Sequence, residues 1–190
     1  MLDNHRVKEI AIATGGDWGG RHADRKFTEL FTRIVGEDIM AEFSQRHPED
    51  WYEIQLNFEQ AKCDAEADET SIEFNLPQPL FKFIEDKDME LEDVINKDSA
   101  EHGLKVSGGL LTISLDTINS FHEESVAHII DKTRELLESD NLIDSDLREI
   151  FLVGGFASCD LLQSRMREEF PEMRISVPED AQAAVVKGNM

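Results

Sequence analysis

A short apolar run followed by two adjacent glycines is the place in this sequence where a ligand could come closest to the backbone. Residues 150–153 are four consecutive apolar residues, which is typical of a strand buried on both faces. Gly154 and Gly155 end the run, and Ser158 is placed to cap a helix that carries the apolar residues of 161–170. A backbone without side chains beside the positive end of a helix suits a planar or anionic ligand, and a nucleotide fits that description.

A purely structural role is the simpler interpretation of these glycines taken alone, because Gly-Gly after a strand often serves only to turn the chain. The sequence around Gly154 is not G-x-G-x-x-G, and it lacks the Lys-Ser/Thr of a P-loop. Neither phosphate-binding motif is therefore present.

The cysteines and histidines give few candidates for a catalytic or metal-binding site. Cys63 and Cys159 are too few for a disulfide framework or a Cys-rich zinc site, which agrees with a reducing compartment. A helix N-terminus beside Cys159 could lower its thiol pKa, so a thiol enzyme is one alternative, but no histidine is close in sequence to act as base. A small buried cysteine is the favoured interpretation. The six histidines show no H-E-x-x-H spacing, and we predict that they are scattered over the surface: His5, His22, His47, His102, His122 and His128.

Composition limits the class of protein and its partners. The 190 residues are 40% hydrophobic and 32% charged, enough for one domain, or one domain with a lobe, around a real core. No apolar run approaches the roughly 20 residues of a membrane helix, and the N-terminus lacks a signal peptide, so a cytoplasmic protein is expected. The net charge of −22 disfavours nucleic acid and anionic membranes as partners. An acidic surface can attract basic partners, although solubility is its simpler role.

The elements that would position the glycine turn alternate between strands and helices. Helical spacing of apolar residues begins at Asp24, is interrupted at Gly36 and extends by another turn or two until Pro48. A further helix follows from about Trp51. An acidic segment, 85–98, holds enough apolar residues for one short helix turned outward. Ser114 is placed to cap a long helix that extends to Leu137. Strands are expected at 7–13, 71–76, 110–113, 150–153 and 173–177, a loop at 141–146 and a last helix at 181–186.

This order predicts an α/β core with an inserted, mainly helical subdomain. The core would comprise residues 1–23 and 115–190, and the insertion residues 24–114. Three core strands are few for an open sheet, so we expect that further strands precede this sequence.

Several motifs in a fixed order carry a resemblance to a known family. The chain resembles the second lobe of the heat-shock 70 kDa protein ATPase domain, and most closely that of the divergent heat shock 70 kDa protein 12 family. The likeness extends over nearly the whole chain. It implies an actin-like (ribonuclease H-like) ATPase fold, in which two lobes close on Mg-ATP, and a chaperone of the stress response. The motifs are Ala13-Thr14-Gly15-Gly16, Asp24 with Phe27, Phe58-Glu59-x-Ala61-Lys62 and Phe151-Leu152-Val153-Gly154-Gly155-Phe156-Ala157.

The resemblance implies that Gly154 and Gly155 border the adenosine and phosphates of ATP or ADP, with Phe156, Ala157 and Ser158 continuing the loop. A conventional member has an arginine in this loop where the present chain has Ser158, so a positive charge is missing there.

The resemblance also implies that a helix of the insertion presents Glu59 and Lys62 to the adenosine. Three residues apart on one helix face, they can offer an acceptor and a donor to a ribose or a base edge. The alternative is an exposed ion pair worth about 0.3 to 0.5 kcal/mol. Cys63 stands where the family commonly has an arginine able to stack on adenine, and Glu66 replaces a small polar residue. Both departures are expected to weaken nucleotide binding.

Other family motifs do not occur in this sequence. The first lobe, its phosphate loop, the lysine that assists hydrolysis and the Asp-x-Gly-Gly-Gly-Thr loop would all precede residue 7. We therefore assign no catalytic and no metal-binding residue, expect no hydrolysis from this chain alone, and expect Mg2+ only with a complete two-lobed domain. The alternative is a truncated relative that no longer binds nucleotide and acts as an acidic interaction module for protein partners or co-chaperones.

Overall fold

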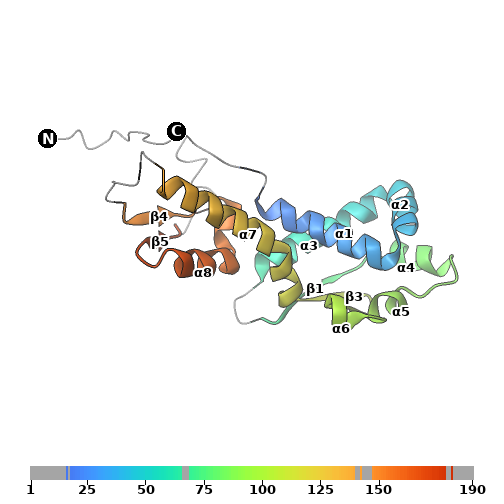
Figure 1. Ribbon diagram of the computed structural model, residues 1–190. Coiled ribbons are helices and arrows are strands. Elements are labelled where there is room, and N and C mark those ends of the chain that lie inside the picture. Colours follow the sequence, from blue (N-terminus) through green and yellow to red (C-terminus); the bar gives the residue numbers. More distant parts are fainter. Residues whose placement is uncertain are drawn as a thin grey trace. The chain divides into compact units, whose positions relative to one another are not determined.

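The chain folds into two compact units. The computed structural model describes residues 16, 18–65, 69–139, 142, 147–178 and 181. We call Arg21–Glu123 the central unit, and Met1–Gly20 with Glu124–Met190 the flanking unit. The predicted insertion, 24–114, lies within the central unit. Helices are combined with small sheets (Figure 1), which agrees with the α/β class at this level.

Three amphipathic helices open the central unit: α1 (Gly20–Val35), α2 (Glu37–Arg46) and α3 (Pro48–Asp64). The helical spacing of apolar residues predicted α1 and α3, and it predicted a further turn or two after Gly36, where α2 lies. The prediction that α1 opens at Asp24 was wrong, because Ala23 is fully buried and extends the apolar face by one turn before Phe27.

Aromatic rings join α1 to α3 in the core of the central unit. The ring of Phe27 stacks on that of Phe58, with centroids 4.0 Å apart and planes 6° apart. Phe74 meets both rings edge-on from the sheet. Phe27 and Phe58 are 1% and 0% exposed, so each contributes about 2 to 3 kcal/mol of hydrophobic burial.

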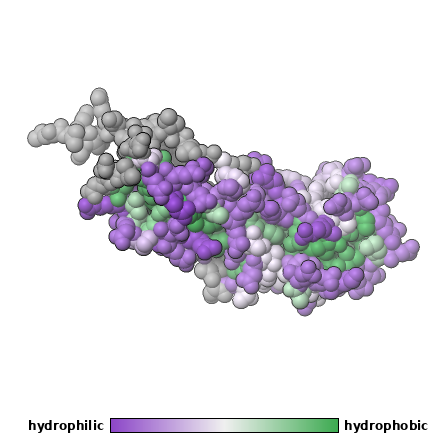
Figure 2. Space-filling view, in the orientation of Figure 1, coloured by the Kyte–Doolittle hydropathy of each residue, from purple (hydrophilic) through white to green (hydrophobic). Residues whose placement is uncertain are grey.

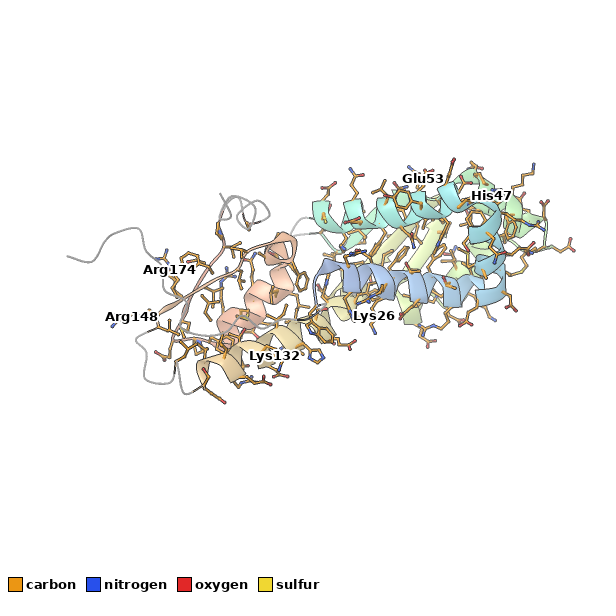
Figure 3. The ribbon with its side chains drawn as sticks, turned by 90° about the horizontal axis from the view of Figure 1, so that it is seen from above. Lys26, His47, Glu53, Lys132, Arg148 and Arg174 are labelled. Carbon is orange, nitrogen blue, oxygen red and sulfur yellow. The ribbon has the colours of Figure 1, made fainter. Side chains whose placement is uncertain are left out.

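A three-stranded antiparallel sheet forms the other layer of this unit, in the order β1 (Ser71–Asn75), β3 (Leu110–Ser114), β2 (Leu104–Ser107). Its pairing register places the buried apolar residues of all three strands on one face, where Ile72 lies opposite Ile113 and Phe74 opposite Leu111. The helices α1 and α3 cover this face (Figures 1 and 3). Strands β1 and β3 were predicted, whereas β2, at only four residues, was not.

Three short helices complete the central unit: α4 (Gln78–Glu85), α5 (Leu91–Asn96) and α6 (Ser99–His102). The prediction of an outward-turned helix in the acidic segment was wrong. Leu91 and Ile95 of α5 are 2% and 0% exposed and belong to the core, because α5 packs on β2. Neither α4 nor α6 was predicted; Pro79 lies in the first turn of α4, where a proline is tolerated.

The flanking unit is built around the end of a long helix, α7 (Leu115–Leu137), which begins in the central unit. Ser114 caps α7 as predicted, since its Oγ accepts a hydrogen bond from the N–H of Thr117 at 3.3 Å. The parallel strands β4 (Glu149–Phe151) and β5 (Arg174–Ser176) follow, with α8 (Asp160–Glu169) between them. The core here includes Leu152, Leu162, Met166 and Phe170.

The prediction that residues 150–153 form a strand buried on both faces was wrong. Phe151 is 62% exposed and Val153 47% exposed, whereas Leu152 between them is buried. The apolar core of this unit covers one face of β4, and within the described part of the chain no element covers the other. The predicted strand 7–13, loop 141–146 and helix 181–186 lie outside the described residues, apart from Leu142 and Ala181.

Candidate functional site

The Gly154-Gly155 turn has the backbone geometry that a close ligand requires. Gly154 has a φ of 92°, in the left-handed region that favours glycine, and its N–H donates to the carbonyl of Ala181 at 2.7 Å. A 3-10 turn, η1 (Gly155–Ser158), follows at once. A Cβ built on either glycine would meet no heavy atom of the described residues within 4 Å. Within the described part of the chain, the Cβ positions of both glycines are therefore open.

The predicted helix cap at Ser158 was wrong. The hydroxyl of Ser158 donates to the carbonyl of Gly155 at 3.1 Å, inside the 3-10 turn, while Cys159 occupies the cap position of α8. Asp160 stands in the first turn of α8 and places a carboxylate at the positive end of the helix. A ligand near this turn would meet the backbone of the glycines and the exposed hydroxyl of Ser158 before it met an open helix end.

The residues after the glycines divide into accessible and buried ones. Ala157 is 2% exposed and Phe156 packs partly buried against the core of the flanking unit. Gln163 donates to the carbonyl of Ala157 at 2.9 Å and fixes the turn on α8. Phe156 and Ala157 thus anchor the loop, and Gly155 and Ser158 form its exposed part.

On α3, the side chains of Glu59 and Cys63 are exposed, whereas that of Lys62 is held inside the central unit. The ammonium of Lys62 pairs with the carboxylate of Asp24 on α1, with the two side chains 9% and 27% exposed. It also lies 5.6 Å from the centre of the Phe58 ring. Asp24, which the sequence indicated only as the start of a helix, is thus an ion-pair partner of Lys62, and this pair is partly buried.

Glu59 lies at a cavity between α1 and α3. The cavity has a volume of about 400 Å3 and is also lined by Arg21, Arg25, Tyr52 and Gln55. Tyr52 is 64% exposed. This arrangement gives Glu59 a neighbourhood of cations, an amide and an aromatic ring, which are groups that can bind a polar, planar molecule.

A buried histidine lies near the Asp24–Lys62 pair and was missed by the sequence interpretation. His122 of α7 is 6% exposed, so the prediction that all six histidines lie on the surface was wrong. Burial, followed by the positive charges of Lys62 and His22, lowers the pKa of His122 to about 4, and its imidazole is neutral at pH 7. The signal was available, because His122 follows Ile118 by four residues on the apolar face of α7.

The thiol of Cys63 is not activated. Burial raises its pKa, the nearby carboxylates of Glu59, Asp24 and Asp64 raise it as well, and the charge of Lys62 opposes this. Cys159 is half-buried at the start of α8, and the described residues contain no disulfide.

The candidate residues thus form two groups, one in each unit. Gly154 to Ser158 make one turn of the flanking unit; Glu59, Lys62 and Cys63 lie on one helix of the central unit. Glu66 lies outside the described residues. The same described part of the chain contains no cluster of His, Cys, Asp or Glu that could hold a metal ion, and none of its helices has the length and apolar composition to cross a membrane.

Comparison with known proteins gives one group of relatives. No family model and no solved structure matches the sequence. Heat shock 70 kDa protein 12A of human and of mouse is 31% identical over 190 residues, which is 98% of this chain. Human heat shock 70 kDa protein 12B is 29% identical over 186 residues, or 96% of the chain.

These relatives place the chain among the heat shock 70 kDa proteins. Within that class it belongs to the heat shock 70 kDa protein 12 family, as the ordered motifs predicted. The chain spans 28% of the length of protein 12A and 27% of that of protein 12B.

Proposed function

We propose that this chain is the nucleotide-binding second lobe of a heat shock 70 kDa protein 12-type chaperone ATPase that acts in the cytoplasm. Gly154 and Gly155 would border the phosphates and adenosine of ATP or ADP. Glu59 and Lys62 would contact the adenosine, with Cys63 on the same helix and Glu66, which lies outside the described residues, further along the chain.

The observation that best supports the proposal is the open backbone at Gly155. This residue is exposed, its φ lies outside the left-handed region, and a Cβ there would meet no described heavy atom within 4 Å. The conformation of Gly155 therefore does not require glycine, whereas the close approach of a ligand to the backbone would. The neighbouring hydroxyl of Ser158 donates its proton to the carbonyl of Gly155 and keeps an acceptor that a ribose hydroxyl can use.

The groups on α3 fit a nucleoside as well. The carboxylate of Glu59 can accept from ribose hydroxyls, and the ammonium of Lys62 is a cation already held in position by Asp24. A ligand that approaches Lys62 must share this ammonium with Asp24, which reduces the gain from the contact. With Cys63 in place of a stacking arginine, we expect modest affinity.

Bound nucleotide would supply the free energy of phosphoanhydride hydrolysis to the complete protein, with Mg2+ held by groups outside this chain. The residues of this chain would bind and orient the nucleotide, and none is assigned to the cleavage step. Hydrolysis would depend on the first lobe.

A titration of the complete two-lobed protein with fluorescent ATP and ADP tests the proposal. Lys62→Ala and Gly155→Leu should each weaken binding about tenfold, which corresponds to about 1.4 kcal/mol. Lys132→Ala and Gly19→Leu are matched controls, since Lys132 is an exposed lysine of α7 (Figure 3) and a Cβ at Gly19 also meets open space. Affinity unchanged in both Lys62→Ala and Gly155→Leu, with the folded state verified by circular dichroism, would refute the proposed site.

The pairing of Lys62 with Asp24 also supports the second candidate, an acidic interaction module without nucleotide. In that case Lys62 stabilises the central unit through its ion pair with Asp24. The net charge of −22 attracts basic partner proteins. Capture of basic proteins that is lost at high salt, together with no detectable ATP binding by the complete protein, would favour this function.

A further inference from the structure

The two edge strands of the central sheet, β1 and β2, differ in how many of their outward backbone groups are hydrogen-bonded. The hydrogen bonds within the sheet show which backbone groups point outward at each edge. Thr70 and Leu76, at the two ends of β1, bond to Leu115 and Gly109 on the β3 side. Because partners alternate along an antiparallel strand, Ile72 and Phe74 also face β3. The N–H and C=O groups of the residues between them, 71, 73 and 75, therefore point away from the sheet. By the same alternation, residues 104 and 106 of β2 point outward at the opposite edge.

Side chains close the β2 edge. Asn96 of α5 donates to the carbonyl of Val106 at 2.7 Å and accepts from its N–H at 2.8 Å, as a neighbouring strand would. The N–H of Leu104 donates to Nδ1 of His102 at 3.1 Å. This edge is thus protected from pairing with another strand.

Among the described residues, nothing pairs with the β1 edge along its first half. At its far end, Asn57 of α3 donates to the outward carbonyl of Asn75 at 3.3 Å. No other described residue makes a hydrogen bond to the outward backbone groups of Ser71 and Glu73. Glu73 is exposed and Ser71 half-exposed, so a strand could reach these groups.

A groove of about 570 Å3 runs along this open half. Its lining includes Ile72, whose side chain faces the core, and Ser71 and Glu73, whose side chains face the opposite side of the sheet. Because residues of both faces line the groove, it lies along the edge of β1. The other wall is the C-terminal end of α3 with Asp64. Of the described residues that line the groove, three have a carboxylate, Asp64, Glu69 and Glu73, and none has a cationic side chain.

We propose that the β1 edge binds an extended, basic peptide segment of a partner protein, which adds as a strand beside β1 and places lysine or arginine side chains against these carboxylates. Main-chain hydrogen bonds would supply affinity and the carboxylates selectivity for positive charge. A second copy of this chain is not the expected occupant, because its own charge of −22 would be repelled by the groove. The proposal gives a location to the acidic interaction module and does not rest on nucleotide binding.

The test uses the full chain and a fluorescent peptide in which lysine and valine alternate over about seven residues, a typical strand length. Two control peptides separate the contributions to binding. An N-methylated peptide of the same sequence keeps the charge but cannot donate main-chain hydrogen bonds on one edge. A peptide of alternating glutamate and valine keeps the strand but reverses the charge. Fluorescence anisotropy at about 50 mM and about 500 mM salt should show binding of the first peptide alone, weaker at high salt.

Two substitutions locate the site. Asp64→Lys should weaken binding about tenfold, whereas Glu53→Lys, the same change of charge near the other end of α3 (Figure 3), should change it less than about twofold. Ser71→Pro removes an outward N–H without changing the charge or a bond to β3, and should also weaken binding about tenfold.

Equal binding of the N-methylated peptide, or equal effects of Asp64→Lys and Glu53→Lys, would overturn the proposal. A concentration-dependent dimer that Ser71→Pro dissolves would identify a second copy as the occupant and would overturn it too. Nucleotide titration of the same variants keeps the two hypotheses distinct. Ser71→Pro, which lies outside the proposed nucleotide site, should leave ATP affinity unchanged, and failure of either function leaves the other measurable.

Discussion

The buried imidazole of His122 predicts that the central unit loses stability in mild acid. A histidine has a pKa of about 6.5 when unfolded, and in the folded chain burial lowers that of His122 to about 4. Between these values the unfolded state binds more protons than the folded state. The stabilising contribution of the neutral imidazole is therefore complete above about pH 6.5 and is lost as the pH falls toward 4.

The size of the effect follows from the two pKa values. Linkage gives a loss of about 2 kcal/mol in the free energy of unfolding between pH 7 and pH 5 from this group, and about 3 kcal/mol at full protonation. Since His122 is only 6% exposed, solvent screening reduces these figures little. For a domain with a total stability of about 5 to 15 kcal/mol, such a change is readily measured.

Urea unfolding followed by tryptophan fluorescence tests this prediction. With Trp18→Phe in the background, Trp51 is the remaining tryptophan of the two and reports on the central unit, where it packs against the core. The difference in stability between pH 7 and pH 5 should be about 2 kcal/mol smaller in His122→Leu than in the parent. The control is His47→Leu, because His47 lies half-exposed beside Asp50 (its position is labelled in Figure 3), and this variant should keep the full pH dependence. An equal loss in the parent and in His122→Leu would refute the assignment of a buried neutral imidazole.

Three further outcomes are expected. Asn96→Ala should lower the free energy of unfolding by about 2 kcal/mol and promote concentration-dependent self-association, because both polar groups of Val106 lose their partner; urea unfolding and light scattering measure the two effects. Phe58→Ala should destabilise the protein by about 3 to 5 kcal/mol in the same assay, whereas Tyr52→Ala, at a side chain 64% exposed, should change stability by less than about 1 kcal/mol. Alkylation of Cys63 by iodoacetamide at pH 8, measured with Cys159 replaced by serine, should be slower than that of glutathione, because burial raises the pKa of the Cys63 thiol.

The parts of the fold that could be predicted from sequence are those where local periodicity and burial agree. The apolar stripes of α1 and α3 became the core, with Phe27, Phe31, Ile54 and Phe58 at most 1% exposed. The cap at Ser114 was predicted because a serine before a helix has one usual role. In these segments, the neighbours along the chain decide the structure.

The predictions failed where distant residues decide it. The apolar run 150–153 carries no information on which faces of β4 will be covered, and Phe151 and Val153 are exposed. The segment 85–98 has an acidic composition, yet its two apolar residues reach the core because α5 packs on a strand, β2, that was itself too short to be predicted.

The candidate site was predicted only in part for the same reason. The identities of Glu59, Lys62, Gly154 and Gly155 came from ordered motifs, which fix positions along the chain but not their partners in space. The pairing of Lys62 with Asp24 joins residues 38 positions apart and has no local signature. His122 did have a local signature, because it lies four residues after Ile118 on the apolar face of α7. The sequence interpretation nevertheless placed it on the surface with the other histidines.

The two glycines of the turn carry different information for anyone who compares sequences of this family. The backbone of Gly154 has a φ of 92°, so the fold itself requires glycine there. Substitution would destabilise the protein, and selection for folding would remove it whether or not a ligand binds. Gly155 has a backbone that any residue can adopt and open space above it. Glycine retained at 154 across many species would therefore be uninformative about activity, whereas drift at 155 toward larger residues would mark the lineages in which ligand binding had been lost.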